Sequence, residues 1–194
     1  MGQRMGVALA LSLAVAASPA WATTYAIDPD HTTVSFKVRH LFSNVQGTFD
    51  EFDGTFDYVP GEPKAWKAQA TIQAASINTR VAQRDTHLRS NDFFEVETYP
   101  TITFTSTGVT DATATSANLH GVLTMRGVEQ PVVLALEMHG EGKDPWGNVR
   151  SGFTATTRIN RKEFGLTWNK TLETGQVLVG EEVEITLEVE GLAK

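Results

Sequence analysis

The 194-residue sequence contains no cysteine. Disulfide bonds, a lipid anchor attached through cysteine and a cysteine nucleophile are therefore all excluded. Without disulfides, the stability of the folded chain must come from a buried apolar core.

Several signatures of enzymes are also missing. The chain has no Gly-x-Ser-x-Gly elbow, no Gly-rich phosphate-binding loop and no His-Glu-x-x-His motif. Asp28, Asp30 and His31 lie close together, but Asp-Pro-Asp is typical of a turn in which carboxylates accept hydrogen bonds from backbone amides. We therefore predict that the protein is not an enzyme and that it has no metal site.

A long apolar run occurs at the N-terminus, where Arg4 precedes residues 7–17 and the small-x-small pattern of residues 18–22 follows. The run is too short to span a bilayer. This arrangement is typical of a cleavable signal peptide, here residues 1–22, rather than of a stable membrane anchor. Residues 23–194 are then predicted to be one exported domain.

Acidic residues outnumber basic ones by 23 to 16, which gives a formal net charge of −7. Removal of Arg4 with the signal peptide makes the exported domain more negative still. This excess argues against nucleic acid or an anionic membrane surface as the main partner.

Apolar and polar residues alternate along most of residues 23–194, which is the pattern of half-buried β-strands. The alternation is clearest at Val34, Phe36 and Val38; at Ala68, Ala70 and Ile72; at Ile102 and Phe104; at Val132, Leu134 and Leu136; and at Val183, Ile185, Leu187 and Val189. The pattern slips by one residue near Asp50-Glu51, which indicates a bulge or a tight turn. Eight or nine antiparallel strands are predicted, forming a closed barrel or a barrel-like sandwich.

Residues 79–95 are the one long segment without this alternation, and we predict that they are helical and lie near a mouth of the barrel. Asn78 or Thr79 is the predicted N-cap. Asp85 and Arg89 are four residues apart and can form an ion pair, although Arg84 or His87 can instead meet the polar head of a ligand. His40 shares the parity of Val34, Phe36 and Val38, so it either faces inward as a ligand contact or serves as a hydrogen-bonded structural histidine.

Small residues on the strand faces indicate a barrel that is not completely filled. They are Ala68, Ala70, Ala74, Gly47, Gly54 and Gly121. An eight-stranded barrel is just wide enough to be filled by side chains or to hold one small ligand, so small inward residues favour a cavity. The alternative is that they let the barrel taper or let a neighbouring segment approach closely.

Ordered matches to one family run along the whole exported domain. They are Tyr25-Ala26-Ile27-Asp28; Val34-x-Phe36-x-Val38-x-His40-Leu41; Gly47-x-Phe49; Ser76-Ile77-x-Thr79; Arg84-Asp85-x-His87-Leu88; Asp92-Phe93-Phe94; Tyr99-Pro100-x-Ile102-x-Phe104-x-Ser106; Gly121-x-Leu123-Thr124-x-Arg126-Gly127-Val128; and Arg161-x-x-Phe164-Gly165. In these motifs the chain resembles the YceI-like family. The resemblance implies a periplasmic, lipocalin-like, eight-stranded antiparallel barrel whose apolar cavity holds a polyisoprenoid or an isoprenoid quinone.

We therefore expect a non-enzymatic carrier or store for such a lipid, with no other cofactor, as a monomer or homodimer. The predicted ligand-binding residues are Phe36, His40, Phe49, Ala70, Arg84, His87, Leu88, Phe93, Phe94, Phe104, Phe164 and Trp168. Phe56 and Phe153 are further aromatic candidates for the cavity wall, and ordinary core packing is the alternative for each aromatic residue. The alternative function is an enzyme that acts on a small apolar molecule, with His40, Asp85 or His87 as acid or base.

Overall fold

The structure is a computed structural model that describes residues 22–172 and 177–194. Residues 1–21 of the predicted signal peptide lie outside the described residues, so that prediction stays a prediction. No helix within the described ranges is long and apolar enough to cross a membrane.

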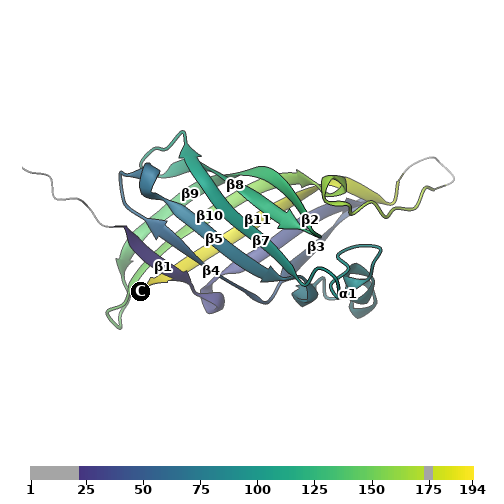
Figure 1. The fold of residues 1–194 in the computed structure, drawn as a ribbon. Coiled ribbons are helices and arrows are strands. Elements are labelled where there is room, and N and C mark those ends of the chain that lie inside the picture. Colours follow the sequence, from purple (N-terminus) through teal and green to yellow (C-terminus); the bar gives the residue numbers. More distant parts are fainter. Residues whose placement is uncertain (1–21, 173–176) are drawn as a thin grey trace, which may run out of the picture.

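Most of the described chain is in β-strands. One α-helix lies at one end of the molecule (Figure 1). The strands are β1 (Thr23–Ile27), β2 (Thr33–His40), β3 (Ser43–Phe49), β4 (Phe52–Tyr58), β5 (Lys67–Gln73), β6 (Ile77–Asn78), β7 (Thr101–Thr110), β8 (Ser116–Met125), β9 (Val128–Lys143), β10 (Val149–Asn160) and β11 (Val179–Ala193). The helix is α1 (Ala82–Arg89), and the 3-10 helices are η1 (Pro29–His31), η2 (Pro63–Ala65), η3 (Ala74–Ser76) and η4 (Arg161–Phe164).

Three breaks in the strands explain how these segments make a barrel of eight strands. β1 continues into β2 after η1, β3 continues into β4 after Asp50-Glu51, and β5 continues into β6 after η3. Both β1 and β2 pair with β11, while β1 pairs with β4 and β2 pairs with β3 on the other side. All pairings are antiparallel, and the remaining strands follow one another in sequence order. The predicted closed eight-stranded barrel is therefore confirmed.

The phase slip near Asp50-Glu51 corresponds to the break between β3 and β4. The chain does not reverse there, because β3 and β4 pair with other strands and not with each other. The Asp50 carboxylate accepts hydrogen bonds from the hydroxyl of Thr48 at 2.7 Å and from the side-chain amide of Asn78 at 2.8 Å. Through Asp50, these bonds connect the β3–β4 strand to β6. Inward side chains have odd numbers in β3 and even numbers in β4, and the wall stays closed across this change.

The end of the barrel away from α1 is filled by an aromatic core. Tyr25 stacks on Phe56 with ring centroids 5.0 Å apart, and Phe56 meets the edge of Phe153 at 5.1 Å. Trp66 packs against Tyr58 and donates its indole N–H to the Val59 carbonyl at 2.7 Å. Phe56 and Phe153 are thus core residues, and neither lines the cavity at the α1 end of the barrel.

The glycines on the strand faces do not leave free space, contrary to our expectation. A Cβ built on Gly121 would lie 2.3 Å from the ring of Phe104, and one built on Gly47 would lie 2.5 Å from the ring of Phe36. At Gly54 the added atom would meet the Gln69 carbonyl oxygen at 2.4 Å. The glycines therefore accommodate neighbouring aromatic rings and backbone, which is the alternative that the sequence left open.

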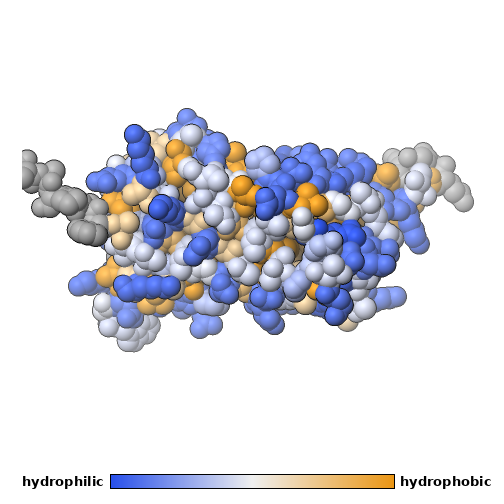
Figure 2. Space-filling model, in the orientation of Figure 1, coloured by the Kyte–Doolittle hydropathy of each residue, from blue (hydrophilic) through white to orange (hydrophobic). Residues whose placement is uncertain are grey.

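On the face of the barrel that Figure 2 shows, polar and charged residues are spread over the whole length, with apolar residues between them. The outward face of the last strand carries several ion pairs, such as Glu184 with Arg158 at 3.1 Å. This is the solvated face that alternating strands predict.

Replacing Gly121 with alanine should destabilise the barrel, because the new methyl group overlaps the Phe104 ring. We expect the free energy of unfolding to fall by about 1–3 kcal/mol in urea denaturation. Gly108→Ala is the matched control, since no atom lies within 4 Å of its added Cβ. Equal stability of the two variants would contradict the tight contact between Gly121 and Phe104.

Candidate ligand-binding site

A cavity of about 830 Å³ lies inside the barrel, on the α1 side of the aromatic core. Its wall is built from alternate residues of the strands, because side chains of every second residue point into a barrel. Val34, Phe36 and Val38 contribute from β2, and their neighbours Ile185 and Leu187 contribute from β11. The volume lies within the range typical of pockets for small ligands.

The exposure of these inward side chains shows that the space is open. Phe36, Ile185 and Leu187 point into the barrel, yet each is only partly buried. By contrast, Leu136 and Met138 on β9 belong to the packed core and are 7% and 8% exposed. The barrel is thus packed at one end and hollow at the other.

Eleven of the twelve predicted ligand-binding residues line this cavity. They are Phe36, His40, Phe49, Ala70, Arg84, His87, Leu88, Phe93, Phe94, Phe104 and Trp168. The exception is Phe164, which lies in η4, is 1% exposed and packs in an apolar cluster behind the wall. Its position on a 3-10 helix rather than a strand takes it away from the lumen.

Many residues of the wall were missed by the sequence analysis. They include Ile72, Ile102, Leu123, Met125, Val132, Ile159, Val179 and Val183. Strand parity could have found most of them, since Ile72 shares a face with Ala70 and Ile102 shares a face with Phe104. Val179 likewise has the parity of Val183, although the register of β11 with β2 shifts between these two residues.

Helix α1 is attached to the barrel through Thr79 and Asp85. Asp85 is buried, and its carboxylate accepts hydrogen bonds from the Thr79 amide at 2.9 Å and from the Thr79 hydroxyl. Arg84 donates to the Thr79 hydroxyl at 2.7 Å and to the Thr79 carbonyl at 3.0 Å. These bonds hold the start of the helix against β6.

The predicted ion pair of Asp85 with Arg89 is wrong. Arg89 donates instead to the backbone carbonyls of Ala75 at 2.6 Å and Ile77 at 2.7 Å. The N-cap position of α1 is Val81 rather than Asn78 or Thr79, and its side chain makes no capping bond. Asp85 does not pair with Arg89 because its carboxylate turns back toward Thr79, whose buried amide would otherwise have no hydrogen-bond partner.

An aromatic cluster joins α1 to the segment that follows η4. The His87 ring meets Trp168 edge-on with centroids 4.9 Å apart and Phe93 at 5.1 Å, and its Nε2 lies 2.8 Å from a carboxylate oxygen of Asp92. Val81 and Gln83, at the start of α1, are the exposed residues of the cavity wall. The cavity therefore opens beside α1.

Arg161 is a buried charge in the cavity wall. It is 4% exposed and donates hydrogen bonds to four backbone carbonyls, those of Gly180, Trp168, Val179 and Leu166. Burial lowers the pKa of its guanidinium. Because these carbonyls belong to two separate segments, Arg161 ties the region after η4 to the start of β11.

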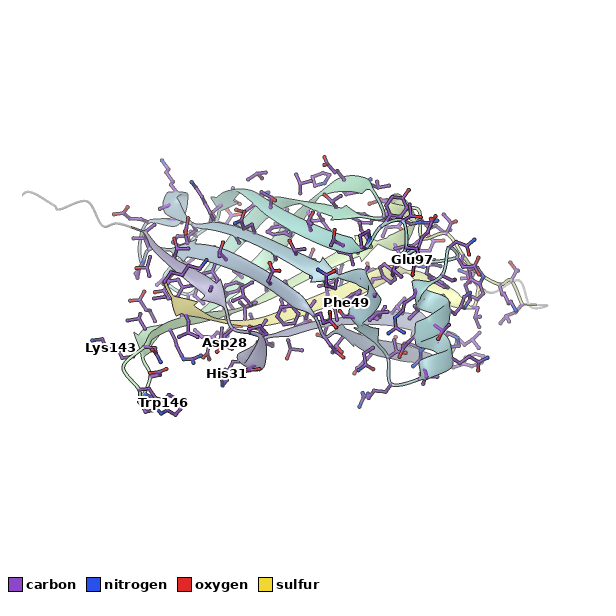
Figure 3. The ribbon with its side chains drawn as sticks, turned by 60° about the horizontal axis from the view of Figure 1, so that its bottom comes forward. Asp28, His31, Phe49, Glu97, Lys143 and Trp146 are labelled. Carbon is purple, nitrogen blue, oxygen red and sulfur yellow. The ribbon has the colours of Figure 1, made fainter. Side chains whose placement is uncertain are left out.

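Asp28, His31 and Glu190 offer the kind of atoms that bind a metal, all within 4.8 Å of one another. Asp28 and His31 lie toward the end of the barrel opposite α1 (Figure 3). Arg150 already donates to Asp28 at 2.7 Å and also to Glu190, while Asp28 accepts the Asp30 amide at 3.1 Å, as the turn pattern predicts. The guanidinium of Arg150 thus occupies the position between the carboxylates where a metal ion would bind, so this cluster does not fit a metal ion.

The guanidinium of Arg150 also lowers the pKa values of the acidic groups around it. Its hydrogen bond is the main reason why the pKa of Asp28 is lowered, with His31 adding to the effect. Hydrogen bonds from Asn148 and Arg150 lower the pKa of Asp144 to about 2.

Comparison with known proteins places this barrel in a family. The family model of the YceI-like domain matches residues 25–191. The chain belongs to the YceI-like family.

Curated relatives of this YceI-like chain include a UPF0312 protein of Ectopseudomonas mendocina, which is 43% identical over 95% of both chains. The UPF0312 protein of Azotobacter vinelandii is 41% identical over the same shares. The YceI protein of Campylobacter jejuni is similar in structure, with a TM-score of 0.70 and 31% identity over 79% of this chain and 87% of that one. A polyisoprenoid-binding domain from Saccharophagus degradans has a TM-score of 0.65 at 17% identity, over 89% of this chain and 99% of that one, and so shares the fold.

Replacing Arg161 with methionine should destabilise the YceI-like barrel, since several buried carbonyls would lose their donor. We expect a loss of about 2–4 kcal/mol in urea denaturation, with faster amide hydrogen exchange near Val179 and Gly180. Arg158→Met is the control, because the Arg158 side chain is 63% exposed and its ion pairs lie in solvent. Similar losses in both variants would show that the four carbonyl contacts contribute nothing.

The stability of the protein should fall in acid, and Arg150 should account for part of the fall. The folded-state pKa of Asp144 is about 2, below the value of about 3.9 in an unfolded chain. Such a group stabilises the fold above pH 4, and this contribution is lost as the pH falls toward 2. In Arg150→Gln we expect a shallower fall of the unfolding free energy over this range than in wild type or in the control Arg158→Gln, measured by urea denaturation. The same slope in all three proteins would contradict the role of Arg150.

Proposed function

We propose that the protein binds a polyisoprenoid or a similar apolar chain in its cavity and acts as a periplasmic carrier or store. The observation that carries this proposal is the apolar cavity of about 830 Å³, closed at one end by the aromatic core and open beside α1. A YceI-like barrel of this kind suits an apolar ligand, and the Saccharophagus degradans domain of the same fold is described as polyisoprenoid-binding. A predicted signal peptide at residues 1–22 supports export to the periplasm.

The shape of the cavity favours a long, narrow ligand. Along β11 the wall extends from Val179 to Val189, which is roughly 30 Å of strand at about 3.3 Å per residue. Burial of several hundred Å² of apolar surface at about 25 cal/mol per Å² yields on the order of 10 kcal/mol before the costs of association. A flexible hydrocarbon chain can therefore be held without any strong polar contact.

The charged and histidine side chains of the wall lie toward the open end. Arg84 and His87 come from α1, and His40 comes from the end of β2. A ligand with a polar head and an apolar tail would place its tail against Leu134 and Val189 and leave its head beside these side chains, where water can reach it. An isoprenoid quinone or another prenyl lipid fits this arrangement.

The enzyme alternative loses one of its three candidate residues. Asp85 does not line the cavity, and its carboxylate is hydrogen-bonded to Thr79, so it is not placed to exchange protons with a ligand. His40 and His87 line the wall, where they can contact a ligand without reacting with it. We propose binding without conversion, so the mass of the bound molecule should be the same before and after prolonged incubation with the protein.

Replacing Ala70 with phenylalanine should block loading, because its side chain points into the cavity and the added ring would fill part of the lumen. Gentle purification and native mass spectrometry should show a lipid adduct on the wild-type protein and at least tenfold less on Ala70→Phe. Gln69→Phe is the matched control, since Gln69 is the neighbouring outward residue of β5 and is exposed.

Circular dichroism and thermal unfolding would confirm that both variants fold. Full loading of a folded Ala70→Phe protein would place the ligand elsewhere. A wild-type protein that carries no lipid and takes up no added prenyl lipid or quinone would refute the proposed function.

A further inference from the structure

Three parts of the chain surround the opening of the cavity, and we call them the rim: residues 39–44, residues 80–84, and residues 168–172 with 177–180. A backbone bond from the Leu41 amide to the Leu178 carbonyl at 3.0 Å joins the first part to the third, and one from the Leu178 amide to the Lys170 carbonyl at 2.9 Å joins the two stretches of the third. Trp168 contacts His87 of α1, which follows the second part. Each part also contributes to the cavity wall, through His40, Val81 and Trp168 respectively.

The rim is positively charged, although the protein is negative as a whole. It carries Arg39, Arg80, Arg84 and Lys170, and its described residues include no Asp or Glu. The complete sequence has 23 acidic and 16 basic residues. The charge that the composition predicts for the whole protein therefore does not hold at the opening of the cavity.

The rim also exposes apolar side chains. Phe42 is 82% exposed, Val81 is 45% exposed and Val177 is 49% exposed. They are three of the five large apolar side chains that are exposed in the described part of the chain. Apolar side chains next to basic ones are the composition of surfaces that bind the interface of anionic membranes.

The hairpin turn that contains Phe42 has an unusual composition for a turn exposed to water. His40 pairs with Ser43, so the hairpin from β2 to β3 turns through Leu41 and Phe42 alone. Leu41 has a φ of 47°, in the left-handed region where Asn, Asp or Gly is usual. Phe42 is 82% exposed and belongs to neither apolar cluster of the described residues, which points to a contact outside the protein.

We propose that the rim docks on the surface of an anionic lipid bilayer. Phe42 and Val81 enter the interfacial region, while Arg39, Arg80 and Lys170 lie beside lipid phosphates. The negative remainder of the surface is repelled by the same bilayer, so only the orientation with the open end toward the membrane is favourable. This inference rests on the proposed function, because an apolar ligand could then pass between bilayer and cavity without crossing water.

The contact is expected to be weak and reversible, as a carrier requires. Each basic residue near an anionic surface raises the affinity by roughly fivefold, and the contribution falls as salt screens the charges. One buried Phe side chain contributes roughly tenfold or more.

Co-sedimentation with vesicles tests the docking directly. The wild-type protein should bind vesicles of phosphatidylcholine mixed with phosphatidylglycerol, should bind phosphatidylcholine vesicles far less, and should be released by salt. We expect roughly tenfold weaker binding for Phe42→Ser, and a loss of similar size for Arg39→Glu.

Two matched variants at the opposite end of the barrel serve as controls (Figure 3). Trp146 is 82% exposed, as Phe42 is, and Lys143 is an exposed basic residue of the same hairpin. Trp146→Ser and Lys143→Glu should bind the mixed vesicles as the wild type does. Equal losses in rim and control variants, or equal binding to both kinds of vesicle, would overturn the docking proposal.

A second measurement separates this proposal from the proposed function. Uptake of the apolar fluorescent probe N-phenylnaphthylamine, measured without vesicles, should be the same in the wild type, Phe42→Ser and Arg39→Glu, because neither Phe42 nor Arg39 lines the cavity. Normal uptake without vesicle binding would refute docking and leave the cavity function standing. No uptake by the wild type would refute the cavity function, whereas vesicle binding by the same protein would leave docking standing.

Discussion

The closed ring of backbone hydrogen bonds is the constraint on which this structure depends. A barrel with an unfilled interior cannot be held together by its core at the hollow end, so the wall must be continuous there. The double pairing of β11, with β1 at one end and with β2 at the other, closes the ring. Among the described strands, each one except the two-residue β6 pairs with a strand on both sides, so the wall surrounds a space with almost no free edge.

Packing is divided unequally along the barrel axis, and this division produces the binding site. At one end Tyr25, Phe56 and Phe153 fill the interior and supply the burial that stabilises the domain. At the other end the inward side chains of the neighbouring strands β2 and β11 do not meet the side chains that face them across the lumen, and the missing contacts cost stability in the empty protein. An apolar ligand restores those contacts, which is a physical reason for binding that needs no specific polar recognition.

The two ends also differ in their electrostatics. At the packed end, Arg150 neutralises a group of carboxylates and holds them in one arrangement. At the open end, the guanidinium of Arg161 donates to backbone carbonyls. The acidic residues that adjoin the rim, Asp85, Asp92 and Glu181, are hydrogen-bonded to Thr79, His87 and Lys162, and not to the basic residues of the rim. Charges therefore stabilise the closed end internally, whereas at the open end they remain available to groups outside the protein.

Strand alternation alone determined the all-β class and the alternating faces of each long strand, including the shared face of Phe36 with Val34 and Val38, since the direction of a strand side chain follows directly from sequence parity. The family resemblance added the eight-stranded closure and the apolar cavity. Tertiary structure decided which half of the barrel is hollow, since Phe36 and Phe56 have the same pattern and differ only in what faces them across the lumen. It also decided that Gly121 accommodates the Phe104 ring, that Asp85 bonds to Thr79 rather than Arg89, and that Phe164 lies behind the wall. These outcomes depend on contacts between residues far apart in sequence or on local backbone turns. Neither produces a periodic pattern of apolar residues from which it could be predicted.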